Sequence, residues 1–251
     1  MTVKDHFSTR AAQYAEYRPH YPAALFDFVA SLPQKQRIAL DCGAGNGQAS
    51  VGLAERFERV VATDPSIAQI ENATAHERIE YRVARAEASG LPSHTADLVT
   101  AAQSLQWFDA AAFFEEAKRV LVADGAIAVW GYGDPVMETP ALHQILHDFN
   151  RGTLETYWFA ERLTLLNGYR DVPFPFEELA TPDLHLQVHW TLDELAGYLR
   201  TWSSTMQYIK ARGVDPVVDV VSALAEYWGD RSSARLIRWP LHIRAGRLKS
   251  D

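Results

Sequence analysis

The segment Ile38-Ala-Leu-Asp-Cys-Gly-Ala-Gly-Asn-Gly47 constrains the fold more than any other part of the chain. A short apolar run ends in an acidic residue, and Gly43, Gly45 and Gly47 follow in a G-x-G-x-G turn. Apolar residues at helical spacing then begin at Ala49. Glycine tolerates positive φ and lets a ligand approach the backbone, and open α/β sheets bind nucleotides at such strand-to-helix turns. An ordinary strand-to-helix turn is the alternative for this segment taken alone.

A second short strand, Arg59 to Asp64, strengthens the nucleotide-binding interpretation. Asp64 follows Gly43 by about 20 residues, the distance at which a nucleotide fold places a carboxylate for the ribose hydroxyls. The alternative role for Asp64 is a helix N-cap, with Pro65 at the first helical position. The two roles are compatible with each other.

The glycine spacing separates two kinds of nucleotide cofactor. The dinucleotide fingerprint is G-x-G-x-x-G, and Gln48 stands where that pattern requires its third glycine. This disfavours an NAD pyrophosphate site. Further strands are predicted over 79–84, 97–101 and 126–130, with a helix over 111–121 and a turn at 123–125 before the last of these strands.

The ordered series over roughly residues 7–132 resembles the class I S-adenosylmethionine-dependent methyltransferases. Asp41 to Gly47 is similar to their first motif, which holds the methionine end of the cofactor, and Asp64 is similar to their ribose-binding acid. The pair Ala86-Glu87 resembles the adenine-contacting pair. The resemblance implies S-adenosylmethionine as cofactor, bound by Tyr14, Arg18, Asp41, Gly43, Ala44, Gly45, Asp64, Pro65, Ala86, Glu87, Gln103, Ser104 and Trp107.

The amino terminus narrows the resemblance. The stretches 7–14 and 17–22 resemble the opening of the trans-aconitate methyltransferase-like group within the type 11 methyltransferases. That resemblance implies a helical lid over residues 1–32, to which Tyr14, Arg18 and Tyr21 contribute. An ordinary amphipathic helix is the alternative, and Pro19 and Pro22 favour a break between two helices.

The class implies a Rossmann-like α/β fold with a seven-stranded, mostly parallel sheet, helices on both faces and an antiparallel last strand. That last strand is expected over 236–243, where Pro240 fits an edge position. Residues 1–251 would form a single domain, with a helical insertion over 133–182 above the active site. Within the carboxyl-terminal part, helices are predicted over 137–150, 156–166, 191–201 and 216–228, and a strand over 184–190.

Gln106 bears on the reaction, because relatives often carry histidine before the Trp-Phe pair. A glutamine can orient a substrate but cannot act as a general base. The sequence therefore favours O-methylation of a small organic carboxylic acid, which needs no base, over an amine, phenol or carbon acceptor. An arginine, from the set Arg18, Arg151, Arg162 and Arg200, would bind the acid. The candidate acceptor-binding residues are Tyr21, Gln106, Tyr132, Tyr157 and Trp158.

Bulk properties fit a cytoplasmic enzyme. The net charge of −8 disfavours nucleic-acid binding, no apolar run is long enough to span a membrane, and Cys42 is the single cysteine. His143 and His147 share helical spacing without an evident third ligand, so no metal is expected. Two other functions stay open: an NAD-dependent oxidoreductase, and a cofactor-binding protein without catalysis. The sequence does not indicate the oligomeric state.

Overall fold

A computed structural model describes residues 18–249, in which nine strands form one extended β structure. The strands pair in the order β3-β2-β1-β4-β5-β9-β6, and β7 and β8 also pair with β9. Their bounds are β1 Ile38–Cys42, β2 Arg59–Asp64, β3 Ile79–Val83, β4 Ala96–Ala102, β5 Leu121–Tyr132, β6 Val136–Met137, β7 Glu177–Leu179, β8 His185–Trp190 and β9 Arg235–Arg247.

Strands β1 to β5 are parallel to one another, and β9 runs antiparallel beside β5. Strands β1, β2 and β4 are almost entirely buried, as expected for parallel strands that helices cover on both faces. The helices of this half are α2 (Ala23–Ser31), α3 (Gln48–Ala54), α4 (Ile67–Glu71) and α5 (Ala110–Val120). The predicted Rossmann-like fold with an antiparallel last strand is therefore confirmed. The expected edge position of that strand is wrong, because β9 also pairs with β6, β7 and β8, and Pro240 lies opposite His185 of β8.

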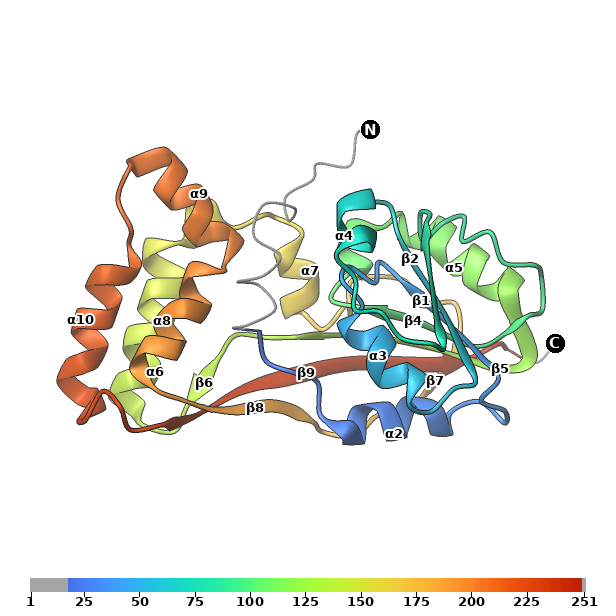
Figure 1. Ribbon diagram of the computed structural model, residues 1–251, viewed down its shortest axis with the longest axis horizontal. Coiled ribbons are helices and arrows are strands. Elements are labelled where there is room, and N and C mark those ends of the chain that lie inside the picture. The colour runs from blue at the N-terminus through green and yellow to red at the C-terminus, as the bar shows by residue number, and fades with distance from the viewer. Residues whose placement is uncertain (1–17, 250–251) are drawn as a thin grey trace.

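Strand β9 connects the two halves of the molecule (Figure 1). Its carboxyl-terminal part, from Leu241 to Arg247, pairs with β5, and β7 lies on its other side. Its first part, from Arg235 to Pro240, pairs instead with β8 and β6 in a small antiparallel sheet. One strand thus belongs to both halves, which fixes the position of the second half relative to the first.

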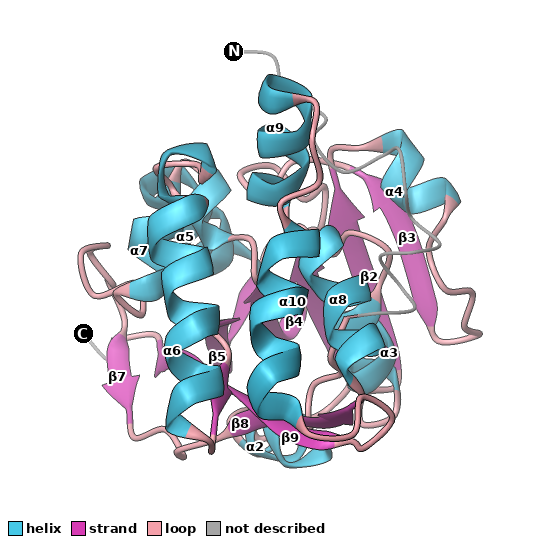
Figure 2. Cartoon of the chain, turned by 90° about the vertical axis from the view of Figure 1, so that its left-hand side faces the viewer, coloured by secondary structure: helices cyan, strands magenta, loops and turns pink. Residues whose placement is uncertain are grey.

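The second half is helical and covers the small antiparallel sheet. Its helices are α6 (Pro140–Asp148), α8 (Leu192–Arg200), α9 (Ser203–Arg212) and α10 (Val217–Trp228). Helix α7 (Arg162–Leu166) lies between the two halves and contacts β5 (Figure 1). Figure 2 shows α6, α10 and α8 side by side, and α10 contacts both of the others. Leu142, Leu195 and Leu224, one from each of these helices, are fully buried in one shared core.

Several local predictions need correction. The sheet has nine strands where seven were expected, because β6 and β7 are too short to stand out in the sequence. The helix predicted over 137–150 begins at Pro140, and 156–166 contains only a 3-10 turn and α7. The turn expected at 123–125 lies inside β5, and α9 was not predicted.

The predicted boundaries of the lid, 1–32, and of the insertion, 133–182, stay predictions. Helix α2 falls within the former, and residues 1–17 lie outside the described part of the chain. The helical half also contains α8, α9 and α10, which follow residue 182. Among the helices of residues 18–249, none has the length and apolar character needed to cross a bilayer.

Candidate functional site

The glycine-rich loop between β1 and α3 is shaped by three positive φ angles. The values are 65° at Gly43, 57° at Gly45 and 90° at Gly47. A Cβ atom at Gly43 would lie 2.7 Å from the Cβ of Ser104, and one at Gly47 would overlap the Tyr81 hydroxyl. At Gly45 the nearest atom is 3.9 Å away. The loop therefore packs tightly at its two ends and is open at its centre, where a ligand can approach the backbone.

Asp41 lies in β1, just before this loop, and fixes its start. Its side chain is fully buried and accepts hydrogen bonds from Ser50 Oγ at 2.6 Å and Thr100 Oγ1 at 2.8 Å. Burial raises the pKa of the carboxyl group to about 6, against the opposing effect of these two hydrogen bonds. Both carboxylate oxygens thus bind groups of α3 and β4, which fixes the start of the loop. A direct contact between Asp41 and the cofactor stays a prediction.

Asp64 ends β2 beside the same loop. Its Oδ2 accepts from the Gly45 amide at 2.9 Å, and its Oδ1 accepts from the Ser66 amide at 2.9 Å. The N-cap alternative for Asp64 is wrong, because helix α4 begins at Ile67 and the side chain of Ser66 caps it. Pro65 accordingly precedes the cap and is not the first helical residue. The Asp64 carboxylate lies beside the open centre of the loop, as a ribose-binding acid would.

Ala86 and Glu87 follow β3. Ala86 is buried, and Glu87 accepts from Arg85 Nε at 3.1 Å and from the Asp109 amide at 2.9 Å. Burial raises the pKa of the Glu87 carboxyl group, but these hydrogen bonds outweigh it and the pKa is lowered. Glu87 thus stays ionised and connects this turn to the start of α5.

The segment after β4 is fixed to both neighbouring strands. Gln103 has a φ of 54°; its amide donates to the Trp130 carbonyl at 2.8 Å, and its Oε1 accepts from the Tyr132 amide at 2.9 Å. Ser104 donates to the carbonyl of Cys42, the last residue of β1 before the glycine loop, at 3.0 Å. Trp107 is 42% exposed and meets Phe159 edge-on, with ring centroids 5.6 Å apart.

These residues suit a nucleoside cofactor. The open centre of the glycine loop offers close approach, and the adjacent Asp64 carboxylate can accept hydrogen bonds from two ribose hydroxyls. The predicted contacts stay predictions residue by residue. Tyr14 lies outside the described residues, so the structure does not place it.

Comparisons with known proteins show the family to which the chain belongs. Residues 40–129 match the family model described as a methyltransferase domain. A protein of Dictyostelium discoideum described as a methyltransferase is 33% identical over 223 residues, which cover 88% of this chain and 85% of that protein. A solved structure from Anaeromyxobacter dehalogenans, described as a type II methyltransferase, is 41% identical with a TM-score of 0.88. It matches 93% of this chain and 100% of that one.

A Saccharomyces cerevisiae protein described as an S-adenosylmethionine-dependent methyltransferase is 28% identical over 134 residues, 50% of this chain and 46% of that protein. The fold, the glycine loop and these relatives define a class I S-adenosylmethionine-dependent methyltransferase. The chain belongs to this methyltransferase family, and its cofactor is S-adenosylmethionine. The NAD-dependent alternative is not favoured.

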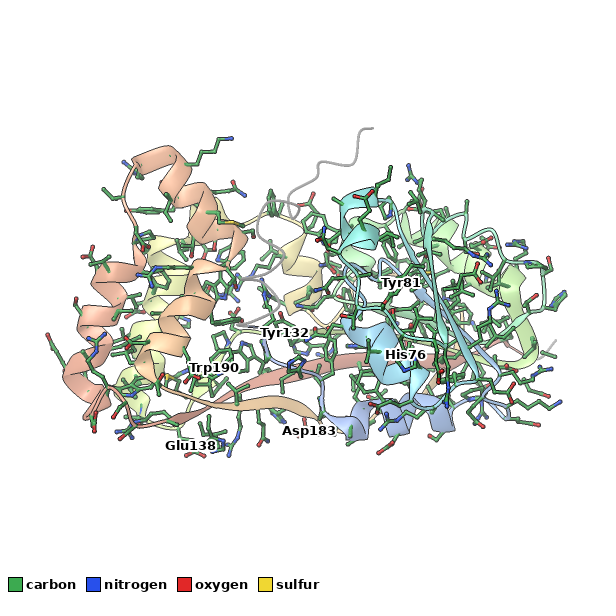
Figure 3. All side chains as sticks on the ribbon, in the orientation of Figure 1. His76, Tyr81, Tyr132, Glu138, Asp183 and Trp190 are labelled. Atoms are coloured by element: carbon green, nitrogen blue, oxygen red, sulfur yellow. The ribbon has the colours of Figure 1, made fainter. Side chains whose placement is uncertain are left out.

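A cavity of about 140 Å³ lies between the two halves. Figure 3 shows Tyr132, one of its lining residues, near the centre of the molecule between the sheet and the helical half. The cavity is about the size of an engineered protein cavity that holds one benzene molecule. Its side-chain lining comes from Arg18, Gln103, Gln106, Trp107, Tyr132, Asp134, Pro135, Trp158, Phe159, Arg162, Leu165, Leu166, Tyr198, Trp202 and Ser203.

Two arginines, Arg18 and Arg162, line the cavity. Arg18 donates to the Tyr132 hydroxyl at 2.5 Å. Arg162 pairs with Asp134, and its guanidinium lies 3.8 Å from the centroid of the Trp158 ring. Burial lowers the pKa of Arg162, the Asp134 charge opposes that change, and a guanidinium stays protonated.

Asp134 also binds Arg151, at 2.9 Å, so one carboxylate balances two cations there. The ion pair of Arg200, by contrast, is with Asp215, and Arg200 is absent from the cavity lining. Of the four arginines considered from the sequence, Arg18 and Arg162 are thus the two that reach the cavity.

The structure brings together three of the five predicted acceptor-binding residues: Gln106, Tyr132 and Trp158 line the cavity. Tyr21 packs behind it, with its ring centroid 6.5 Å from that of Tyr132. Tyr157 faces α9, where its ring packs on Tyr208 and its hydroxyl accepts from Arg212 at 3.0 Å.

Sequence reasoning missed Asp134, Phe159, Tyr198 and Trp202 as lining residues. Tyr198 and Trp202 stand four residues apart, a helical spacing that could have been noticed, whereas nothing local to Asp134 indicates its role. Within residues 18–249, no cluster of three or more potential ligands from His, Cys, Asp and Glu could hold a metal ion.

Proposed function

We propose that this methyltransferase transfers the methyl group of S-adenosylmethionine to a carboxylate oxygen of a small organic acid bound in the central cavity. The guanidinium groups of the cavity carry the proposal. Two guanidinium groups and one carboxylate are among its described lining residues, in a chain whose net charge is −8. Guanidinium groups favour an anionic acceptor and suit carboxylates.

The absence of a suitable base among the described lining residues supports the same acceptor. Asp134 is held in ion pairs with two arginines, which engage both of its carboxylate oxygens. The Tyr132 hydroxyl accepts from Arg18. Burial raises the pKa of the Tyr198 hydroxyl, and the neighbouring Tyr132 raises it further. Amine or phenol acceptors need a group that takes a proton, whereas an ionised carboxylate does not.

The reaction demands positioning more than proton transfer. The carboxylate oxygen, the methyl carbon and the sulfur must lie in line, with the reacting atoms about 3–3.5 Å apart before the reaction. The cavity lies at the ends of β4 and β5, next to the segment 103–107 and therefore next to the glycine loop that Ser104 contacts. Aromatic walls exclude water and orient the acid.

Five finer assignments are part of the proposal. The resemblance of segments 7–14 and 17–22 supports membership of the trans-aconitate methyltransferase-like group, with residues 1–32 as its lid and residues 133–182 as the insertion above the site. The enzyme would act in the cytoplasm and as a single domain. The contacts of Arg18 with Tyr132 and Tyr198 support a role for the amino-terminal segment in closing the cavity.

The test is turnover with isotope-labelled S-adenosylmethionine against a panel of small carboxylic acids, phenols and amines. We expect base-labile methyl esters, formed at a rate that stays flat from about pH 6.5 to 8.5 because no base titrates. A base-stable product on nitrogen, carbon or a phenol would overturn the carboxylate assignment. Absence of turnover with the whole panel, in spite of cofactor binding, would favour a cofactor-binding protein without catalysis.

One arginine variant and its control test where the carboxylic acid binds. Arg162→Met should weaken acceptor binding by about 10- to 100-fold, as for a charge-assisted hydrogen bond, and leave cofactor affinity unchanged. Arg231→Met is the matched control, because Arg231 pairs with Asp193 on the surface and is absent from the cavity lining. Equal acceptor binding in both variants would remove Arg162 from the site.

A further inference from the structure

A buried tyrosine behind the cavity has no role in the site as described so far. Tyr169 follows α7, is 0% exposed, and has a φ of 59° directly after Gly168 at 65°. A non-glycine residue in this region is strained and persists only where its surroundings hold it. Here the Tyr169 amide donates to the Thr164 carbonyl at 2.9 Å, and its carbonyl accepts from Arg244 at 2.7 Å.

The strained turn directs the Tyr169 hydroxyl across β5 toward the cavity. The Tyr169 hydroxyl lies beside Gly131. A Cβ atom at position 131 would lie 2.8 Å from that hydroxyl and 2.5 Å from Oε1 of Gln103. Only glycine leaves room for both groups at this position. The missing side chain at 131 therefore opens a passage between the buried turn and the segment after β4.

The Tyr169 hydroxyl contacts the side-chain amide of Gln106. Tyr169 donates to Gln106 Oε1 at 3.0 Å, and Gln106 Nε2 donates to the carbonyl of Gln103 at 2.9 Å. A carbonyl only accepts, so the nitrogen of the amide must face Gln103 and its oxygen must face Tyr169. With both ends held, the amide plane has one orientation, and the second N–H of Nε2 stays available on a residue that lines the cavity.

We propose that Tyr169 is a positioning residue, which orients the Gln106 amide so that its second N–H donates to an oxygen of the methyl acceptor. This proposal rests on the proposed function of the acceptor cavity and specifies further which methyl acceptors that cavity prefers. A fixed N–H donor favours an acceptor oxygen with a free lone pair and opposes an ammonium group. Gln106 thus binds the acceptor, and Tyr169 acts through it.

The distribution of backbone strain supports this role independently. Within residues 18–249, three non-glycine residues have positive φ: His94, Gln103 and Tyr169. Two of the three, Gln103 and Tyr169, are the two hydrogen-bond partners of Gln106. Strain of this kind concentrates where a protein holds functional groups in a fixed geometry.

The first test needs no acceptor. In protein labelled with ¹⁵N-glutamine, the side-chain resonances of Gln106 are assigned by their loss in Gln106→Glu. In Tyr169→Phe we expect these resonances to shift and their hydrogen exchange to accelerate by about tenfold, in line with the loss of one hydrogen bond. Unchanged shift and exchange would overturn the proposal, whatever the enzyme methylates.

The second test is a double-mutant cycle on whichever acceptor is methylated. Tyr169→Phe should lower kcat/KM by about tenfold, Gln106→Ala by at least as much, and the double variant no further than Gln106→Ala alone. Additive losses would show that Tyr169 acts on the fold and not through Gln106. Tyr227→Phe, which alters an exposed tyrosine of α10, is the control and should leave kcat/KM unchanged.

Discussion

The two halves of the molecule differ in how far apart along the chain their interacting residues lie. In the nucleotide-binding half, Asp41 and Ser50 are 9 residues apart and Gly45 and Asp64 are 19 apart. At the cavity beside the helical half, Tyr169 and Gln106 are 63 residues apart, and Arg18 and Tyr132 are 114 apart. The contacts of the cofactor loop with α3 and β2 therefore join near neighbours in sequence, with added support from Thr100, 59 residues from Asp41, and Ser104, 62 residues from Cys42. The most distant of these cavity contacts, between Arg18 and Tyr132, spans 114 residues and depends on the complete fold.

This contrast predicts that changes in the glycine loop act on the cofactor alone. Gly45→Val should abolish measurable S-adenosylmethionine binding, with a loss above about 100-fold, because the branched side chain opposes φ of 57° and occupies the open centre of the loop. The measurement is calorimetric titration with the cofactor, together with circular dichroism to confirm folding.

Gly213→Val is the matched control for that variant. Gly213 has a φ of 73° with no atom within 4 Å of a Cβ placed there, so it carries similar backbone strain at the end of α9. Similar destabilisation in both variants, with lost cofactor binding only in Gly45→Val, is the expected pattern. Normal cofactor binding by Gly45→Val would contradict the assignment of the loop.

Asp64 is expected to have the next largest effect. Asp64→Ala removes a carboxylate that accepts from the Gly45 amide beside the open centre of the loop and would accept from the ribose, so cofactor affinity should fall by about 1.5–3 kcal/mol. Asp64→Asn keeps one acceptor oxygen and should recover part of the loss. Calorimetry on both variants gives the two affinities, and an unchanged affinity in Asp64→Ala would remove Asp64 from the cofactor site.

The same contrast explains what the sequence could predict. The strand-glycine-helix pattern and the acid about 20 residues later are local, so the parallel sheet and the loop follow from residues 38–64. The N-cap alternative for Asp64 was wrong because two polar residues, Asp64 and Ser66, were both close enough to cap α4, and the backbone after Pro65 selects Ser66.

The acceptor cavity was predictable only in part. Gln106, Tyr132 and Trp158 were found because they lie beside motifs or in aromatic runs. Asp134 and Tyr198 enter the cavity through the path of β5 and the packing of α8, which no local pattern shows. Tyr157, from the same aromatic run as Trp158, faces α9 because successive residues of a short turn point in different directions.

The next prediction concerns how the free energy of unfolding depends on pH through Asp41, and its expected effect is of intermediate size. Its pKa is raised by burial from an ordinary 3.8 to about 6, so the folded state binds its proton more tightly than the unfolded state. The stability associated with this proton is fully present below about pH 4 and is lost as the pH rises through about 6.

The unfolding free energy of wild type relative to Asp41→Asn should therefore fall by on the order of 2 kcal/mol between pH 4 and 7. Taking the difference between the two proteins cancels the titration of the other carboxyl groups. Urea denaturation at four or five pH values measures it. A difference that does not vary with pH would show that Asp41 ionises normally in the folded protein.

The smallest expected effect compares one helix cap from each half. Thr191 caps α8 in a complete capping box with Glu194, and Ser66 caps the five-residue helix α4 beside Asp64. Thr191→Ala should lower the free energy of unfolding by about 1 kcal/mol and leave cofactor affinity unchanged, because α8 belongs to the helical half. Ser66→Ala should cost less stability, since Ser66 caps a helix of five residues without the reciprocal hydrogen bond that Glu194 adds at α8, but it should weaken cofactor binding slightly through Asp64. Chemical denaturation and cofactor titration of both variants would give these four values. A loss of cofactor affinity in Thr191→Ala equal to that in Ser66→Ala would show that the two halves do not act separately.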